Sequence, residues 1–232
     1  MKKMRAFANV VIVLMLSTLA IFAFNNSTSM SVQADVRVIY AGDESSNNVS
    51  FMVNVYQRED LVLNMLDILD LYKVKTTFFI GGCWAVNNLD VVKEIYSRGH
   101  ELGNHGFYHK DQSKLNYQEN RQEIQTCHEV VKKNLGVEMT LFAPPSGAYD
   151  TATVDAASDL NYKTIMWTHD TIDWRDQDAD LIFNRAINNL SNGDLILMHP
   201  TEKTVQAFAN IISTAINNGF NPTTVSNCLL AE

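Results

Sequence analysis

Hydrophobic positions along the chain follow two spacings, one typical of buried strands and one typical of amphipathic helices. Residues 49–56 read Val-Ser-Phe-Met-Val-Asn-Val-Tyr, a β-rich run that predicts a strand. Shortly after it, Leu61, Met65 and Ile68 recur at the spacing of one helix face. The same succession of strand and helix repeats along most of the chain.

The repeated units predict a parallel sheet covered by helices. Strands are expected at residues 36–40, 49–56, 75–80, 140–142, 163–167, 194–198 and 223–225. Helices are expected at residues 61–71, 89–98, 117–135, 151–160, 178–190 and 205–218. Short connections between such units imply parallel strands, and about seven of them in roughly 200 residues indicate a small α/β barrel that is closed or nearly closed.

The N-terminal segment, residues 1–34, has the features of an export signal. Lys2, Lys3 and Arg5 precede a long apolar run, and a small-x-small pattern ends at Ala34. This order is typical of a signal peptide cleaved after Ala34, and an uncleaved membrane anchor is the alternative. Either predicts a domain over residues 35–232 that is secreted or held at the outer face of the cell membrane through this segment alone.

Net charge and cysteine content exclude several kinds of partner and structural site. The formal net charge is −8, and the leader contributes only positive residues, which argues against nucleic acid and against docking on anionic lipid. Cys83, Cys127 and Cys228 are too few for a disulfide framework and fit no zinc module, so we expect them to be small buried residues. One undivided domain of this size is expected to be a monomer with a single core.

A candidate metal site lies in residues 99–111, which read Gly-His-Glu-Leu-Gly-Asn-His-Gly-Phe-Tyr-His-Lys-Asp. His105 and His109 are four residues apart, a spacing at which two side chains on a helical turn or tight loop point the same way. Neutral imidazole is a common ligand for zinc and its neighbours. The pair therefore predicts a site for a divalent ion, most plausibly zinc.

Other unusual polar residues also follow predicted strands. They are Asn54, the Pro144-Pro145-Ser146-Gly147 segment, His169, Asp170, Asp173, Trp174 and His199. In parallel barrels, chemistry collects at the carboxyl ends of the strands. Their joint placement at such ends favours an active site over ordinary loop residues.

Several motifs in a fixed order resemble a known family. They are Thr-Phe-Phe-Ile-Gly-Gly at 77–82, Gly-His-Glu-Leu-Gly-Asn-His at 99–105 with His109, residues 142–147, Asp173-Trp174 and Leu197-Met198-His199. From about residue 49 to 225 the chain resembles the polysaccharide deacetylase domain (NodB-homology domain, carbohydrate esterase family 4). The resemblance implies a distorted (β/α)7 barrel of the NodB/glycoside hydrolase-deacetylase type. It also implies metal-dependent removal of acetyl groups from amino sugars of peptidoglycan or another acetylated polysaccharide.

The resemblance assigns roles to residues of this chain. His105 and His109 match the two metal histidines, His199 matches the general acid, and Asp173 matches the aspartate of the family's Asp-Trp motif, through which an arginine steadies the base. Residues expected to contact the substrate are Tyr56, Pro145, Ser146 and Trp174. The backbone N–H of Ser146 stands where the family holds the oxyanion.

Three positions depart from the family pattern. The family's Asp-Asp pair aligns with Asn54, the catalytic base position, and Val55, the third metal ligand. The motif arginine aligns with Ala143. An amide does not take up a proton at neutral pH, and a valine does not bind metal. Any metal is therefore expected to be weakly held or absent.

Two classes of function remain open. One is a divergent extracytoplasmic deacetylase whose base is replaced by a nearby carboxylate such as Asp111 or Asp170. The other is a catalytically impaired glycan-binding or scaffold protein, with Trp84, Trp167 or Trp174 stacking on sugars. A metalloprotease is disfavoured because the sequence has no His-Glu-x-x-His motif.

Overall fold

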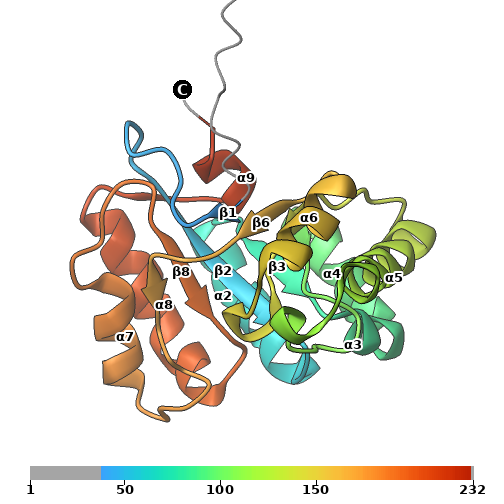
Figure 1. Ribbon diagram of the computed structural model, residues 1–232. Helices are drawn as coiled ribbons and strands as arrows, with labels where there is room; N and C mark the ends of the chain where they lie inside the picture. Colours follow the sequence, from blue (N-terminus) through green and yellow to red (C-terminus); the bar gives the residue numbers. More distant parts are fainter. Residues whose placement is uncertain (1–37, 231–232) are drawn as a thin grey trace, which may run out of the picture. The chain divides into compact units, whose positions relative to one another are not determined.

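The described part of the computed structural model, residues 38–230, is built around one curled sheet of parallel strands (Figure 1). The strands are β1 (Val38–Ile39), β2 (Asn48–Val55), β3 (Thr77–Ile80), β4 (Glu101–Asn104), β5 (Leu141–Phe142), β6 (Lys163–Ile165), β7 (His169–Asp170), β8 (Leu195–Met198) and β9 (Asn221–Pro222). They follow the order β1-β6-β5-β4-β3-β2-β8-β7, with β9 beside the start of β2. The end strands β1 and β7 are not paired with each other, so the barrel is distorted and open.

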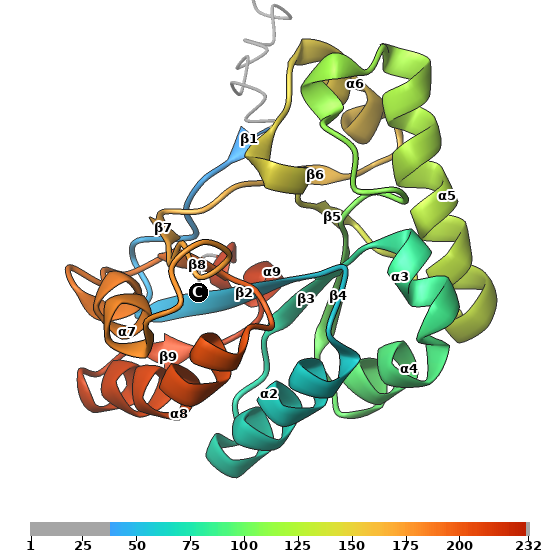
Figure 2. The ribbon, with the colours of Figure 1, turned by 90° about the horizontal axis from the view of Figure 1, so that it is seen from below.

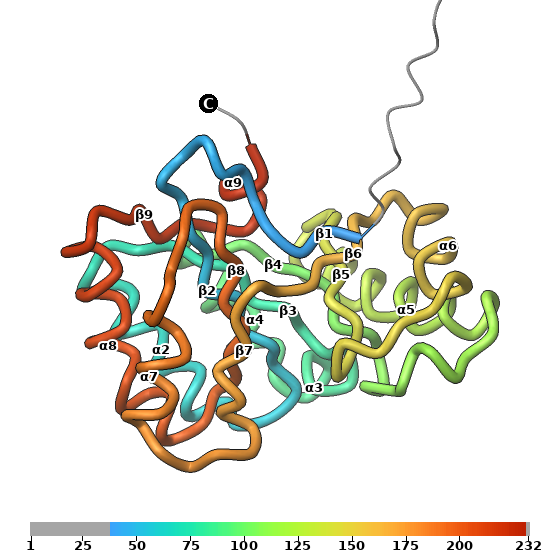
Figure 3. Tube along the Cα trace, turned by 60° about the vertical axis from the view of Figure 1, so that its left-hand side comes forward, coloured from blue at the N-terminus to red at the C-terminus, as the bar shows by residue number. Residues whose placement is uncertain are grey.

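The strands surround a common centre (Figure 2). Helices cover the outside of the sheet, except for the last one, which packs through Val225 and Cys228 against the apolar cluster that includes Met52. They are α2 (Glu59–Tyr72), α3 (Gly82–Asn87), α4 (Leu89–Ser97), α5 (Tyr117–Leu135), α6 (Thr151–Asp159), α7 (Ala179–Ile187), α8 (Glu202–Asn217) and α9 (Val225–Cys228), with short 3-10 turns η1 (Gln112–Lys114) and η2 (Pro145–Gly147). Helices α7 and α8 pack together on one flank and α5 and α6 on the other (Figure 3). The fold is therefore the (β/α)7 type that the sequence predicts.

Strand β2 shows why the sheet lies inside the molecule. All eight of its residues are buried. Phe51 and Val55 belong to the large apolar cluster shared with the helices, whereas Met52 belongs to a smaller cluster inside the barrel. Because successive side chains of a strand alternate between its faces, Asn54 points to the same side as Met52. The strand thereby places one polar side chain inside the barrel, at its carboxyl end.

The register of the strands aligns their carboxyl ends. Val55 lies beside Ile80, and Ile80 lies beside Asn104. The residues that follow β2 and β4, Tyr56 and His105, therefore begin at the same edge of the sheet. This is the edge at which parallel barrels carry their functional groups.

The expected helices are present, with ends that shift by a few residues. The last expected strand, residues 223–225, is displaced, because β9 covers Asn221–Pro222 and Val225 begins α9. The Thr224 side chain accepts a hydrogen bond from the Asn227 N–H, which is an N-cap and starts a helix there. The sequence reading also missed α3 and the short strands β4 and β7, which are too brief for a clear hydrophobic period.

The predicted leader, residues 1–34, lies outside the described residues. Within residues 38–230, no helix has the length and apolar character that crossing a membrane requires.

Candidate functional site

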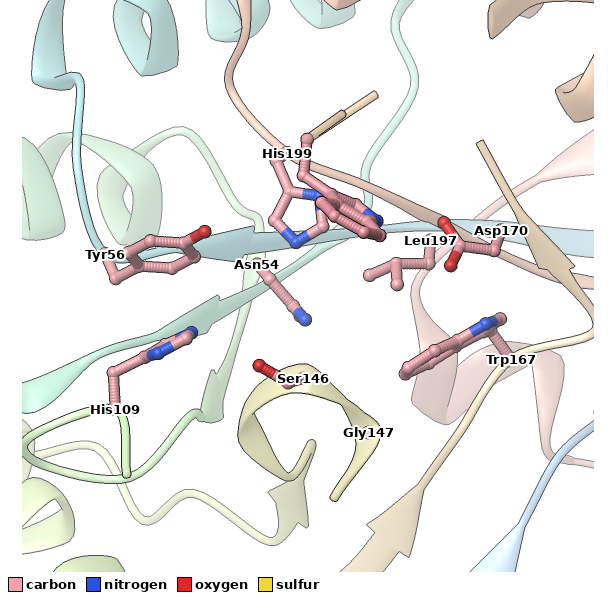
Figure 4. Close-up of a pocket in the computed structure, with 10 residues that line it drawn as sticks. Asn54, Tyr56, His109, Ser146, Gly147, Trp167, Asp170, Leu197 and His199 are labelled. Carbon is pink, nitrogen blue, oxygen red and sulfur yellow. The ribbon is translucent and has the colours of Figure 1, made fainter. Parts of the chain in front are cut away.

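A cavity of about 290 Å³ opens at the carboxyl ends of the central strands (Figure 4). It is lined by Asn54, Tyr56, His109, Ser146, Gly147, Trp167, Asp170, Trp174, Leu197 and His199. These residues come from the ends of β2, β6, β7 and β8 and from the loops after β4 and β5. The structure thus brings together most of the polar residues that the sequence places after strands.

The two predicted metal histidines lie together. Their ring centroids are 5.0 Å apart, close to the roughly 5 Å expected when both rings bind one zinc ion at ordinary Zn–N distances. His105 is fully buried, and its Nδ1–H donates to the Ala143 carbonyl over 2.8 Å. This bond leaves Nε2 as the free nitrogen, and that atom is buried without a hydrogen-bond partner.

Both imidazoles are held in the neutral form that binds metal. Burial, with a smaller contribution from His109, lowers the pKa of His105 to about 3. Burial also lowers the pKa of His109. At neutral pH neither ring therefore carries a proton that would compete with a ligand for its lone pair.

A buried carboxylate fixes the loop that carries His109. Glu123 on α5 accepts hydrogen bonds from the backbone N–H groups of Phe107 and Tyr108 over 3.0 and 2.7 Å, and its other oxygen pairs with Lys110 over 3.1 Å. His109 itself has a φ of 55°, a left-handed conformation that needs such support. The sequence reading missed Glu123, which an ordinary helical pattern conceals.

The predicted general acid is tightly oriented. Asp173 is fully buried and accepts bonds from His199 Nδ1 over 2.8 Å, from the His199 backbone N–H over 2.6 Å and from the Thr204 hydroxyl over 2.6 Å. Since Nδ1–H donates to the carboxylate, Nε2 is the nitrogen that remains for a ligand. Asp173 does not line the cavity, so it acts through His199. Thr204 had no signal in the sequence beyond its place at a helix start.

The partners of Asp173 differ from the partner that the resemblance implies for the family. The resemblance implies an arginine, replaced here by Ala143, that steadies the base through the Asp-Trp aspartate. Both oxygens of Asp173 are instead taken up by His199 and Thr204. Although the arginine is absent, both oxygens of Asp173 therefore have hydrogen-bond partners.

The three residues that depart from the family pattern are apolar or neutral. Asn54 is 2% exposed, and its Oδ1 is buried without a partner. Val55 is fully buried in the apolar cluster between sheet and helices. Ala143 is fully buried, and its carbonyl serves His105. A carboxylate is thus missing at both family positions.

Tyr56 lies among the three histidines of the site. Its ring centroid is 4.1 Å from that of His109 and 6.1 Å from those of His105 and His199. Burial and the charge of Asp173 raise the pKa of Tyr56, so its hydroxyl stays protonated at neutral pH. Figure 4 shows that hydroxyl pointing toward His199 and Asn54.

The loop after β5 supplies the opposite wall. Ser146 has a φ of 56° and directs its hydroxyl into the cavity (Figure 4). A Cβ on Gly147 would lie 2.6 Å from the Trp167 ring, so only glycine fits there. Pro145, expected to contact substrate, is buried and lies outside the cavity lining. Trp174 lines the cavity while 57% exposed, whereas Trp84 is buried in the core.

The donor set fits a metal ion only in part. Across residues 38–230, no group of three or more His, Cys, Asp or Glu side chains is placed to hold one ion. His105 and His109 fit a two-imidazole site, and the unpaired Nε2 of His105 suits a ligand. The third protein ligand of a typical zinc site has no counterpart at Val55.

Comparison with known proteins places this site in context. The family model for polysaccharide deacetylases matches residues 43–165. The uncharacterized protein YlxY of Bacillus subtilis is 36% identical over 191 residues, which are 82% of this chain and 60% of YlxY. A peptidoglycan-N-acetylglucosamine deacetylase of Bacillus cereus is 31% identical over 171 residues, which are 71% of this chain and 80% of that protein. The chain therefore spans less than two thirds of YlxY.

The solved structures that resemble this chain include one described as a pseudoenzyme. BA3943 of Bacillus anthracis, described as a CE4 family pseudoenzyme, matches with a TM-score of 0.81 at 32% identity, over 83% of this chain and 69% of that one. A BA3943 mutant described as having restored enzymatic activity matches with a TM-score of 0.81 at 30% identity, over 83% of this chain and 71% of that one.

Proposed function

Because the chain belongs to the polysaccharide deacetylase family, we propose that it binds acetylated amino-sugar chains of peptidoglycan or a related glycan and hydrolyses them poorly. The observation that carries this proposal is Asn54. It is buried at the end of β2, in the cavity, where removal of a proton from water needs a carboxylate. An amide at that place binds but does not act as a base.

The rest of the cavity suits a neutral acetylated sugar. No Lys or Arg is among the residues that line it. Leu197 and Trp167 offer apolar surface for an acetyl methyl group, and the exposed ring of Trp174 offers a face on which a sugar can stack. His199 and Ser146 add polar groups that fix orientation.

We further propose that His105 and His109 hold a divalent ion, zinc by preference, with low affinity. When bound, the ion would polarise the acetyl carbonyl and acidify a water molecule. His199 would stand ready to protonate a departing amine through Nε2, but no side chain at Asn54 would take up the proton of the attacking water. A site with a general acid but no general base would bind the glycan without turning it over efficiently.

The site of action is proposed to lie outside the cytoplasm. The support is the leader pattern in the sequence together with the cell-wall glycan named for the B. cereus relative. The protein would meet its glycan after export, either free or anchored by residues 1–34.

A second candidate, an active deacetylase with Asp170 as its base, rests on the presence of that carboxylate in the cavity lining. Figure 4 places Asp170 beyond Leu197, at the end of the cavity away from His109. A base must lie within hydrogen-bond reach of the attacking water. The first candidate is therefore favoured.

Calorimetric binding and acetate release, measured side by side, test the proposal. The N-acetylglucosamine tetramer should bind, and acetate should form far more slowly than the roughly 1 s⁻¹ or faster turnover of ordinary enzymes, even with zinc added. Trp174→Ala should weaken binding about tenfold. Leu181→Ala, which alters an exposed apolar residue on α7, should bind as the wild type does. No detectable binding, or fast acetate release, would contradict the proposal.

A further inference from the structure

Tyr56 lines three neighbouring cavities at the mouth of the barrel. It lines the main cavity, a neighbouring hollow that includes Arg58 and Trp174, and another that includes Trp84 and Tyr108. Its ring lies against that of His109, with the centroids 4.1 Å apart and the ring planes tilted by 40°. A glycan chain that runs across the barrel mouth therefore contacts this ring.

The Tyr56 hydroxyl is an unused donor. No hydrogen bond joins it to another of residues 38–230, and Figure 4 shows it directed into the cavity. A phenol carries its proton at neutral pH and can therefore donate it in a hydrogen bond. A ligand that covers this O–H group without accepting a bond from it would leave a polar group desolvated, so a ligand that offers an acceptor is favoured.

Asn54 supplies a second neutral donor in the same space. Figure 4 shows its amide nitrogen pointing into the cavity, toward Ser146 and below the Tyr56 hydroxyl. A carbonyl oxygen has two lone pairs and accepts two such bonds. An aspartate at this position would present only acceptors.

We propose that the Tyr56 hydroxyl and the Asn54 amide together hold the carbonyl oxygen of an acetylamino group, so that acetyl recognition does not depend on a metal ion. This inference rests on the proposed glycan-binding function and names its specificity-determining residues. It also gives a reason why the site can lack a third metal ligand at Val55, because two neutral donors would bind the carbonyl in place of a metal ion. A deacetylated amino sugar lacks the carbonyl and loses both bonds.

Titration calorimetry in excess EDTA provides the test. The wild type should bind the N-acetylglucosamine tetramer more tightly than the fully deacetylated tetramer. Tyr56→Phe keeps the ring and removes the hydroxyl, and it should weaken binding of the acetylated tetramer about 5–10-fold, the effect of one hydrogen bond. Its affinity for the deacetylated tetramer should not change. Asn54→Asp should weaken binding of the acetylated tetramer to a similar extent.

Tyr96→Phe is the matched control, since Tyr96 is an exposed tyrosine on α4 far from the cavity lining. It should bind like the wild type, and thermal unfolding of each variant checks its fold. The inference is overturned if Tyr56→Phe binds the acetylated tetramer as tightly as the wild type does, or if EDTA abolishes the preference for acetyl groups. Failure of the wild type to bind either tetramer would instead overturn the proposed function itself.

Discussion

The site has two halves, one around His199 and Asp173 and the other around Asn54 and His105. They differ in how many of their buried polar atoms have a hydrogen-bond partner. On one side, both oxygens of Asp173 accept bonds from His199 and Thr204, and the whole arrangement is buried. On the other side, Asn54 Oδ1 and His105 Nε2 are buried without partners. The first half is complete without a ligand, whereas the second half needs one.

Of the two unpaired groups, Asn54 lies where the family pattern has a charged residue, while the backbone that positions it matches the family fold. Asn54 still ends β2 inside the barrel, and Ala143 still supplies the carbonyl that orients His105. The positions that differ from the family pattern are Asn54, Val55 and Ala143, whereas His105, His109 and His199 are present. This arrangement agrees with the proposed role in binding rather than turnover.

The largest effect should come from breaking the paired half. Asp173→Ala leaves the His199 N–H groups and the Thr204 hydroxyl without an acceptor inside the protein. Loss of one member of a buried charged network costs about 3–5 kcal/mol. Urea unfolding should show a decrease of that size in the free energy of unfolding.

The matched control is Asp170→Ala, which removes a carboxylate from the cavity wall that bonds only the Ile172 N–H in residues 38–230. It should change the free energy of unfolding by no more than about 1 kcal/mol. Equal losses in the two variants would mean that Asp173 has no special structural role.

Restoring the missing carboxylates should have the next largest effect. Asn54→Asp with Val55→Asp is expected to raise acetate release from N-acetylglucosamine oligomers by about 10²-fold or more in the presence of zinc, because general base catalysis contributes that much. Without zinc, a carboxylate at the fully buried Val55 position should lower the thermal midpoint. Added zinc should recover part of that loss.

The single variant Asn54→Asp separates the effect of the base from that of the metal ligand, since it restores the base without the third ligand. It should release acetate more slowly than the double variant. A wild type that is faster than both would show that the natural site has its own base and would support the hydrolase. Ala143→Arg should add little, because Asp173 is already fully paired.

The sequence predicted the fold well because most of its elements carry a strong period. The eight buried residues of β2 and the long helix α5 follow simple patterns, and α5 also has an Asn116–Glu119 capping box and ends at Gly136. The short strands β4 and β7 carry no period. They form by pairing with the edge of a neighbouring strand, β4 with β3 and β7 with β8.

Several residues that line the cavity were named from the sequence, but their hydrogen-bond partners were not. His105, His109, Asn54 and His199 were found from motifs and strand ends. The partners Thr204 and Glu123 come from helix positions that look ordinary in sequence, and only the packing of α8 and α5 against the barrel brings them to the site. Hydrogen bonds between distant segments leave no local pattern.

Acid should weaken the fold through the unpaired half. The pKa of His105 is lowered by burial to about 3, far below the value near 6.5 in an unfolded chain. Below pH 6.5 the unfolded state therefore binds a proton that the folded state does not, so stability falls with decreasing pH, by about 1.4 kcal/mol per unit for this residue. The loss continues until pH approaches 3, where the folded protein also takes up the proton.

Urea unfolding of the wild type and His105→Gln at pH 7.0, 6.0 and 5.0 measures this contribution. The variant should show the smaller dependence on pH. His128→Gln is the control, since that ring is paired with Tyr162 and Glu138 away from the cavity. Identical pH dependence in the wild type and His105→Gln would contradict burial of a neutral imidazole.

The smallest effect should come from zinc on the wild type, because a site of two imidazoles binds weakly. Zinc at ten times its dissociation constant stabilises a folded protein by about 1.4 kcal/mol, which raises the thermal midpoint of a domain of this size by roughly 3–6 °C. His109→Ala should abolish that rise, because one remaining imidazole does not hold the ion, whereas His128→Ala should keep it. A rise that persists in His109→Ala would place the zinc elsewhere on the protein. No rise at any zinc concentration would mean that the two histidines serve the glycan alone, which would extend the metal-independent recognition proposed for Tyr56 to the whole site.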